Sequence, residues 1–308
     1  MPFLTSAAAD FDASTLAERR RNQALDVSVC LPARNEDATV GTIVTALRRD
    51  LVDRAGLVDE VVVVDDRSTD DTAEVARRAG AVVVAVDDVL PEAGPGAGKG
   101  NALWASLFAS SGDIVCWVDS DIRNFDTQFV VGLLGPLLTD TATEFTKGFY
   151  HRPTDDGAGG GRVTELMARP VISRFFPALT RIVQPLAGEY AGRRRLLETL
   201  PFVEGWGVEL GLLIDVVDRV GIGAVAQVDL GTREHKRRPL AELGPQATAI
   251  LATALRRAGI DGPDRVTAEL TRFDAEHSVE HVEVNITERP PIIEIPAYRA
   301  EFGRELSA

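Results

Sequence analysis

The sequence predicts an α/β fold, with a mostly parallel sheet covered by helices on both faces. Two observations support this prediction. Short β-branched runs alternate with helical patterns between residues 27 and 121, and a polar or glycine-rich segment follows each run. This β-α-β order is typical of parallel sheets. The 308 residues, 45% of them hydrophobic and 26% charged, suffice for one large domain or two small ones.

The alternating elements can be placed along the chain. We expect strands where β-branched residues cluster, at 27–32, 60–66, 81–86 and 113–119. Helical patterns lie between them, at 39–49, 69–80 and 100–110. Ligands bind such sheets beyond the carboxyl ends of the strands. The predicted ligand-binding edge is therefore formed by the polar segments 32–36, 65–70, 94–99 and 119–121.

Changes in composition divide the rest of the chain. Residues 1–24 have sparse apolar positions, so we expect a loose or weakly helical N-terminal extension. The regular alternation ends near residue 135, which separates a first half, 25–135, from a second half with longer loops, 136–245. For residues 246–308 the sequence predicts a helix followed by an extended arm, and we expect this arm to take part in the interface of a homodimer.

The charge and the cysteines exclude some classes of protein. A net charge of −14 argues against nucleic-acid and membrane-surface partners, because both require a basic face. Cys30 and Cys116 lie in apolar runs and are expected to be free, buried thiols. No signal peptide and no apolar run of about 18 residues is evident, so a cytoplasmic protein is expected.

The segment GPGAGKGN, residues 94–101, combines four glycines with one lysine. The P-loop pattern GxxxxGK[ST] does not fit, because Ala93 occupies its first glycine position and Gly100 follows Lys99. A phosphate at this loop must therefore belong to another architecture. A flexible, solvated loop remains the alternative.

The segment WVDSD ends an apolar run with Asp119 and Asp121 on either side of Ser120. Alternate side chains of an extended backbone point the same way, so both carboxylates can face one cation. Hard divalent cations take such oxygens and bridge them to substrate phosphates. Helix-capping or solvated aspartates are the alternative for this short motif.

Longer motifs add a resemblance to a known family. The segments at 31–36, 63–72, 94–101 and 118–121 resemble the glycosyltransferase-A fold, in which a nucleotide-sugar lies across the strand ends. The second half resembles the actinobacterial glucosyl-3-phosphoglycerate synthases in the motifs GGGRVTELMARP, QPLAGEYAGRR, GWGVELGLLID and AQVDLGTREHKRRPL. The resemblance runs from about Val27 to Gly244.

The resemblance implies a donor site and a reaction. Glucose would pass from UDP-glucose to the 2-hydroxyl of 3-phosphoglycerate with retention and with Mg²⁺ or Mn²⁺ as cofactor. The donor would be bound by Pro32, Ala33, Arg34, Glu36, Asp66, Ser68, Lys99, Asp119 and Ser120. The catalytic positions would be Asp119, Asp121, Glu209, which binds the glucose, and Leu186, whose carbonyl orients the acceptor hydroxyl.

The resemblance also implies an acceptor site and a metal site. The phosphate and carboxylate of 3-phosphoglycerate would be held by Gly161, Arg162 and Thr164. Glycine amides that lead into a helix, together with an arginine, suit such an anion. His235 would join Asp121 as a metal ligand.

Three departures from the family pattern bear on specificity. Arg237 stands where the family has Asn, and we assign it to the acceptor. Arg34 and Asp66 replace the usual Leu and Ser, which leaves the nucleotide open. The competing interpretations are a mannosyl-3-phosphoglycerate synthase that uses a GDP-sugar, a polyprenyl-phosphate glycosyltransferase, and a nucleotide-sugar-binding regulator without catalysis.

Overall fold

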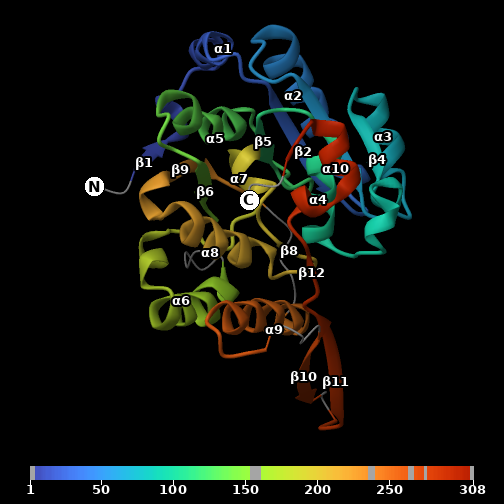
Figure 1. Ribbon diagram of the computed structural model, residues 1–308. Helices are drawn as coiled ribbons and strands as arrows, with labels where there is room; N and C mark the ends of the chain where they lie inside the picture. The colour runs from blue at the N-terminus through green and yellow to red at the C-terminus, as the bar shows by residue number, and fades with distance from the viewer. Residues whose placement is uncertain (1–3, 153–160, 235–239, 263–266, 274–275, 306–308) are drawn as a thin grey trace.

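The computed structural model describes residues 4–152, 161–234, 240–262, 267–273 and 276–305. Its centre is an eight-stranded sheet with the strand order β1-β9-β6-β7-β5-β2-β3-β4 (Figure 1). Every pairing in the sheet is parallel except the two made by β7, which runs antiparallel to β5 and to β6. The strands are β1 (Thr5–Ala7), β2 (Val27–Ala33), β3 (Glu60–Asp65), β4 (Val82–Ala85), β5 (Ile114–Trp117), β6 (Phe145–His151), β7 (Tyr190–Arg193) and β9 (Val225–Thr232).

Helices cover both faces of this sheet, as the sequence predicts. Successive valines of β3 alternate between two apolar cores, with Val61 and Val63 in one and Val62 and Val64 in the other. This alternation follows from the two-residue period of a strand. On the first face lie α1 (Ala13–Asn22), α2 (Asp37–Leu47), α3 (Thr72–Arg78) and α5 (Gln128–Thr139), and on the second lie α4 (Lys99–Ala109) and α8 (Val208–Val220).

The N-terminal segment differs from the expected loose extension. The strand β1 adds to the sheet edge, with Thr5 paired to Gln227 of β9. Asp12 caps α1 by accepting a hydrogen bond from the Thr15 amide at 2.9 Å, and Leu16 of that helix is fully buried. The helix α1 agrees with the weakly helical alternative, whereas the strand was not expected, because three residues leave almost no periodic pattern in a sequence.

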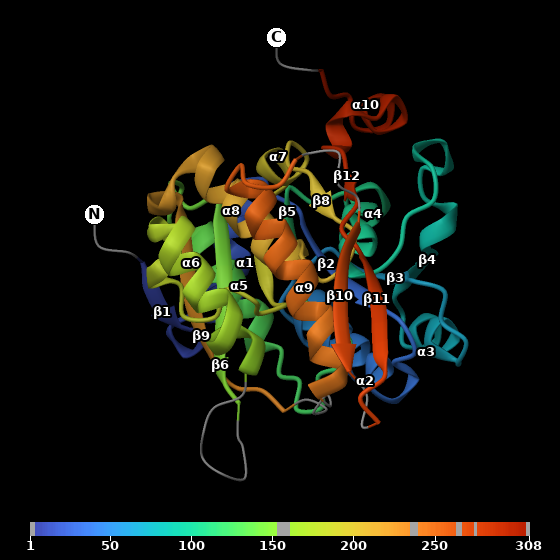
Figure 2. The ribbon, with the colours of Figure 1, turned by 90° about the horizontal axis from the view of Figure 1, so that it is seen from below.

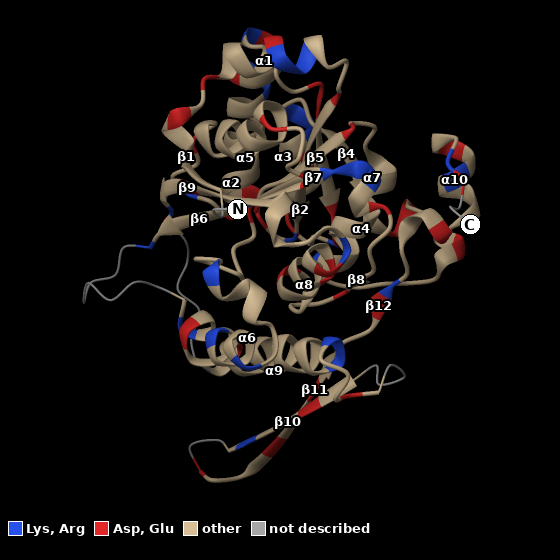
Figure 3. Ribbon diagram, turned by 60° about the vertical axis from the view of Figure 1, so that its left-hand side comes forward, with Lys and Arg blue, Asp and Glu red and all other residues tan. Residues whose placement is uncertain are grey.

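The C-terminal part contains the predicted helix, α9 (Leu240–Arg257), after which a hairpin extends away from the central sheet and the chain then returns to the body (Figure 1). The antiparallel hairpin of β10 (Thr267–Phe273) and β11 (Val279–Asn285) packs beside α9 (Figure 2). Acidic residues lie along it (Figure 3), and Glu269, Glu280 and Glu283 are exposed. After the hairpin, β12 (Glu288–Arg289) pairs with β8 (Phe202–Val203), and α10 (Pro296–Phe302) follows η8 (Ile292–Glu294).

The remaining short helices lie mainly in the second half. They are η1 (Ala8–Asp10), η2 (Arg48–Arg54), η3 (Val86–Asp88), η4 (Pro91–Ala93), η5 (Thr164–Ala168), α6 (Arg169–Phe175), η6 (Pro177–Arg181), α7 (Arg194–Leu197) and η7 (Ile222–Ala224). None of the described helices is long and apolar enough to cross a membrane.

Candidate functional site

The carboxyl ends of the central strands bring the predicted loops together. The Ser120 hydroxyl, after β5, donates to the Pro32 carbonyl of β2 at 2.7 Å. The Gly98 amide, at the start of α4, donates to the Asp66 carboxylate after β3 at 3.2 Å. The four polar segments therefore share one edge of the sheet, as their order in the sequence predicts.

The loops after β2 and β3 are joined by reciprocal hydrogen bonds. The Asn35 amide donates to the Ser68 hydroxyl at 3.0 Å, and the Thr69 amide donates back to the Asn35 side chain at 2.8 Å. The Glu36 amide donates to the Thr72 hydroxyl at 2.8 Å. Ser68 thus links two loops instead of capping the helix that follows it.

The two unusual residues of these loops lie near each other. Arg34 Nη1 is 4.0 Å from Asp66 Oδ2, and Arg67 binds the other carboxylate oxygen of Asp66 at 2.9 Å. Ala33 is buried beneath them, and its carbonyl accepts the Asp66 amide at 2.8 Å. The departures at positions 34 and 66 therefore have opposite charges that compensate each other.

Lys99 connects two parts of the site. Its Nζ lies 2.5 Å from Asp119 Oδ1 and 2.7 Å from Glu209 Oε1, in the first turn of α8. Burial lowers the pKa of Lys99, but the two carboxylates outweigh it and hold that pKa well above its usual value. The partner that the buried Glu209 requires is this ammonium group.

Arg233, at the end of β9, lies between several acidic groups. Its Nη2 atom is 3.0 Å from Asp119 Oδ2 and 2.7 Å from Asp121 Oδ1, and its Nη1 atom is 3.1 Å from Glu189 Oε1. Nη1 also donates to the Tyr150 hydroxyl at 2.7 Å. Sequence reasoning missed Arg233 because it precedes a run of charged residues that resembles a solvated surface.

The carboxylates of Asp119 and Asp121 converge on a single point, the Nη2 atom of Arg233. Their oxygens can therefore reach one cation together, and carboxylate oxygens suit Mg²⁺ and Mn²⁺. Within the described ranges, no three His, Cys, Asp or Glu side chains form a complete metal cluster. His235, the third predicted ligand, lies outside the described residues, as does Arg237.

A buried turn supports Asp119 from behind. A Cβ atom at Gly188 would lie 2.3 Å from Asp119 Oδ2, so only glycine permits this approach. The Ala187 carbonyl accepts a hydrogen bond from the fully buried Lys147 at 2.6 Å, and Leu186 precedes it. Burial lowers the pKa of Lys147 to about 7. Burial also raises the pKa of Glu189 to about 7, although Arg233 opposes it.

The predicted acceptor segment begins a helical turn. Gly161 has a φ of 110°, and its carbonyl accepts the Glu165 amide at 2.9 Å. Thr164 is buried at the start of η5, whereas Arg162 is exposed. Gly161 is the only glycine of the predicted run that lies within the described residues, so the prediction of an anion site at this run stays a prediction.

Comparisons with known proteins agree with this architecture. The glycosyl transferase family 2 profile matches residues 28–164. A glucosyl-3-phosphoglycerate synthase of Mycolicibacterium smegmatis is 47% identical over 274 residues, which are 86% of this chain and 88% of the relative. The chain belongs to the glucosyl-3-phosphoglycerate synthases. A family member from Petrotoga mobilis is 41% identical over 94% of this chain and 93% of its own length.

Solved structures of related enzymes confirm the glycosyltransferase-A fold. The glucosyl-3-phosphoglycerate synthase of Mycobacterium tuberculosis, in complex with Mn²⁺, UDP-glucose and phosphoglyceric acid, matches with a TM-score of 0.85 and 44% identity. The match covers 95% of this chain and 98% of that one. The mannosyl-3-phosphoglycerate synthase of Rubrobacter xylanophilus matches with a TM-score of 0.87 and 37% identity, over 95% and 97% of the two chains.

Proposed function

We propose that the chain is a retaining, metal-dependent glucosyltransferase that moves glucose from UDP-glucose to the 2-hydroxyl of 3-phosphoglycerate. The observation that carries the proposal is the match over 95% of the chain to an enzyme crystallised with Mn²⁺, UDP-glucose and phosphoglyceric acid. The cluster around Asp119 agrees with this chemistry, because it combines convergent carboxylates with a lysine at the ligand-binding edge.

The donor role is assigned to the loops at the strand ends. Glucosyl transfer requires that the charge of the diphosphate be neutralised, and Lys99 supplies a partly buried ammonium group there. The residues proposed to bind the donor are Pro32, Ala33, Arg34, Glu36, Asp66, Ser68, Lys99, Asp119 and Ser120. Most of the donor site therefore belongs to residues 25–135, and the acceptor site belongs to residues 136–245.

The metal role is assigned to Asp121 and His235. The divalent ion, when bound, stabilises the negative charge of the departing UDP. Glu209 contacts Lys99, which also contacts Asp119, so Glu209 lies beside the proposed donor site. From there we expect its carboxylate to accept hydrogen bonds from the glucose hydroxyls. The Leu186 carbonyl orients the acceptor hydroxyl, and the described residues provide its rigid support through Lys147 and Ala187.

The acceptor role is assigned to Gly161, Arg162, Thr164 and Arg237. The first three lie where the chain enters a helical turn, and an arginine binds a phosphate or carboxylate with two parallel hydrogen bonds. If Arg237 contacts the acceptor, Arg237→Asn should lower kcat/KM for 3-phosphoglycerate about ten- to hundredfold. A change within about twofold would show that Arg237 faces solvent.

Mannosyl transfer from a GDP-sugar is the second candidate. The Rubrobacter xylanophilus match favours it, as does the Arg34–Asp66 pair, which replaces a neutral pair at the base-binding loops. Transfer to a polyprenyl phosphate and a purely regulatory role lack such support. The described helices include no membrane-crossing one for a polyprenyl acceptor, and a regulator without catalysis would not require the convergent carboxylates.

A panel of sugar nucleotides tests the proposal. UDP- and GDP-linked glucose and mannose are each incubated with 3-phosphoglycerate and Mg²⁺ or Mn²⁺, and the released nucleoside diphosphate is measured. We expect the highest kcat/KM with UDP-glucose and an α-linked product. A preference for GDP-mannose would support the second candidate, and no turnover with any donor would overturn both.

The cellular state is a further part of the proposal. We place the enzyme in the cytoplasm as a homodimer, with the C-terminal residues 246–308 at the interface. The hairpin supports this, because Phe273 and Val279 face each other across its strands and expose 67% and 56% of their surface. Light scattering should give twice the mass of 33.1 kDa. A monomer at micromolar concentration would contradict the homodimer.

A further inference from the structure

Arg289, in the C-terminal strand β12, forms hydrogen bonds with the glycine-rich loop at residues 94–101 and with the residue before it. Its Nη1 donates to the Ala93 carbonyl at 2.8 Å, its Nη2 to the Gly94 carbonyl at 2.9 Å, and its Nε to the Asn101 side chain at 2.7 Å. The residue is 6% exposed. One guanidinium group thus ties three points on both sides of Lys99 to a segment almost 200 residues away.

The guanidinium group is itself held in place. Glu204 Oε1 lies 3.3 Å from Arg289 Nε, and the ring of Trp104 lies 5.0 Å from the guanidinium carbon. The other oxygen of Glu204 accepts a hydrogen bond from Asn285 at 3.1 Å. A buried arginine is costly unless it is paired and hydrogen-bonded, and both conditions are met here.

The same strand pair supports the start of α4. Arg289 pairs in register with Phe202 of β8. Two residues further, the Glu204 carbonyl accepts the Gly100 amide at 2.7 Å. A Cβ atom at Gly100 would lie 1.7 Å from the Val203 carbonyl oxygen, so this contact requires glycine. The turn that carries Lys99 is therefore fitted against β8 and β12.

We propose that Arg289 is a positioning residue for the sugar-nucleotide donor. It fixes residues 93–98, so that the amides of the loop and the Lys99 ammonium group are in place before the diphosphate binds. Arg67 holds the other side of the loop, where it donates to the Gly96 carbonyl at 2.9 Å. The inference rests on the proposed function, because the donor role of Lys99 is part of that proposal.

A matched control separates positioning from general stability. Arg194 is also buried, at 1% exposure, and also binds backbone carbonyls and a side chain. Its partners include the Gly112 carbonyl at 2.6 Å and the Ser110 hydroxyl at 2.9 Å, beyond the opposite end of α4. Arg194→Met should therefore destabilise the fold without changing the loop.

The experiment compares Arg289→Met, Arg289→Lys and Arg194→Met with the unmodified enzyme. Four quantities are measured: KM for UDP-glucose, KM for 3-phosphoglycerate, Kd for UDP with Mg²⁺, and amide hydrogen exchange of residues 93–98. Arg289→Met should raise KM for UDP-glucose and Kd for UDP about tenfold and accelerate exchange in the loop. KM for 3-phosphoglycerate should stay within about twofold.

Arg289→Lys should have an intermediate effect, because one ammonium group lacks the planar fork that spans both carbonyls. This variant carries the test if Arg289→Met does not fold. Equal changes in the two KM values, or the same changes in Arg194→Met, would overturn the positioning role. If the unmodified enzyme does not use UDP-glucose, the proposed function fails, and hydrogen exchange still shows whether Arg289 fixes the loop.

Discussion

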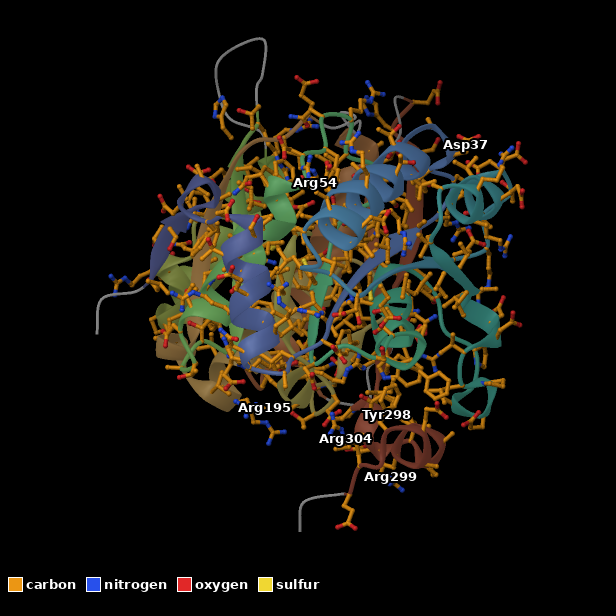
Figure 4. All side chains as sticks on the ribbon, turned by 90° about the horizontal axis from the view of Figure 1, so that it is seen from above. Asp37, Arg54, Arg195, Tyr298, Arg299 and Arg304 are labelled. Carbon is orange, nitrogen blue, oxygen red and sulfur yellow. The ribbon has the colours of Figure 1, made fainter. Side chains whose placement is uncertain are left out.

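Two buried arginines, Arg233 and Arg194, have different kinds of partner. Arg194 is surrounded by neutral acceptors, among them the Gly112 carbonyl and the Ser110 hydroxyl. The hydroxyl of Tyr298, which Figure 4 marks in α10, lies 3.5 Å away. Arg233 is surrounded by carboxylates at the end of the sheet. The neutral acceptors around Arg194 satisfy the hydrogen-bond donors of a single charged group. The surroundings of Arg233 bring several charged groups close together.

The Arg233 cluster contains more acidic than basic groups. Its acidic groups are Asp119, Asp121, Glu189 and Glu209, and its basic groups are Arg233, Lys99 and Lys147. Buried charges of one sign are unfavourable unless a counter-charge neutralises them. From this comparison we infer that the Arg194 cluster stabilises the fold, and we propose that the Arg233 cluster binds a cation and a charged ligand.

The largest expected effect is in the Arg233 cluster. Asp121→Ala should lower turnover about a thousandfold or more, because it removes a proposed ligand of the divalent ion that would stabilise the negative charge of the departing UDP. The urea midpoint should change little, since the Asp121 side chain is 36% exposed. Steady-state kinetics and urea unfolding measure the two quantities. Full turnover in this variant, or in EDTA, would contradict a metal at this position.

The Arg194 cluster should respond in the opposite way. Arg194→Met leaves buried carbonyls without a donor, so the free energy of unfolding should fall by about 3 kcal/mol. The fraction that remains folded should keep its KM for UDP-glucose within about twofold. Urea unfolding and kinetics at a temperature well below the transition measure these changes. A large rise in KM for UDP-glucose with an unchanged free energy of unfolding would contradict a purely structural role of Arg194.

The sequence predicts one side of this comparison better than the other. The strands β2 to β5 and the four polar loops are predictable because β-branched runs and their spacing are local patterns, and the Asp119–Asp121 pair directly follows one such run. The partners Arg233 and Glu189 are not predictable, because they lie beside strands that are 114 and 70 residues beyond Asp119 in the chain.

The supports of the site are equally hidden in the sequence. Arg289 stands in the segment ERPPIIEIP, which reads as an extended arm, and nothing local indicates its contact with Ala93. Lys147 is the one lysine or arginine of β6, whose sequence FTKGFYH mixes polar and apolar residues, and its buried position depends on β7 and the turn at Ala187. The positions of such residues can be predicted only if the strand order is known, and composition and periodicity do not determine that order.

A third arginine sharpens the comparison because it is exposed. Arg162→Ala should raise KM for 3-phosphoglycerate about ten- to hundredfold, since a charge-assisted hydrogen bond to the acceptor is lost. KM for UDP-glucose and the urea midpoint should both stay nearly constant, in contrast to Arg194→Met. Initial rates with each substrate varied separately give the two KM values. Equal losses for donor and acceptor would remove Arg162 from the acceptor site.

The smallest expected effect concerns Lys147, at the edge of the Arg233 cluster. Its pKa is about 7 in the folded protein, because burial disfavours the charged form, against 10.5 for an ordinary lysine. Above pH 7 the unfolded chain therefore binds more protons than the folded one, and the free energy of unfolding rises with pH. The slope approaches about 1.4 kcal/mol per pH unit. Below pH 7 both states carry the charge, and the contribution is flat.

Urea unfolding between pH 7 and 8 measures this slope, where most thiols of the unfolded chain still hold their protons. Lys147→Met should flatten the rise, because methionine binds no proton in either state. Arg194→Met is the control: its overall stability is lower, but its slope should equal that of the unmodified enzyme, since an arginine stays charged throughout this range. An unchanged slope in Lys147→Met would mean that the buried ammonium group keeps its proton throughout this range, and that the neighbouring carboxylates outweigh the effect of its burial.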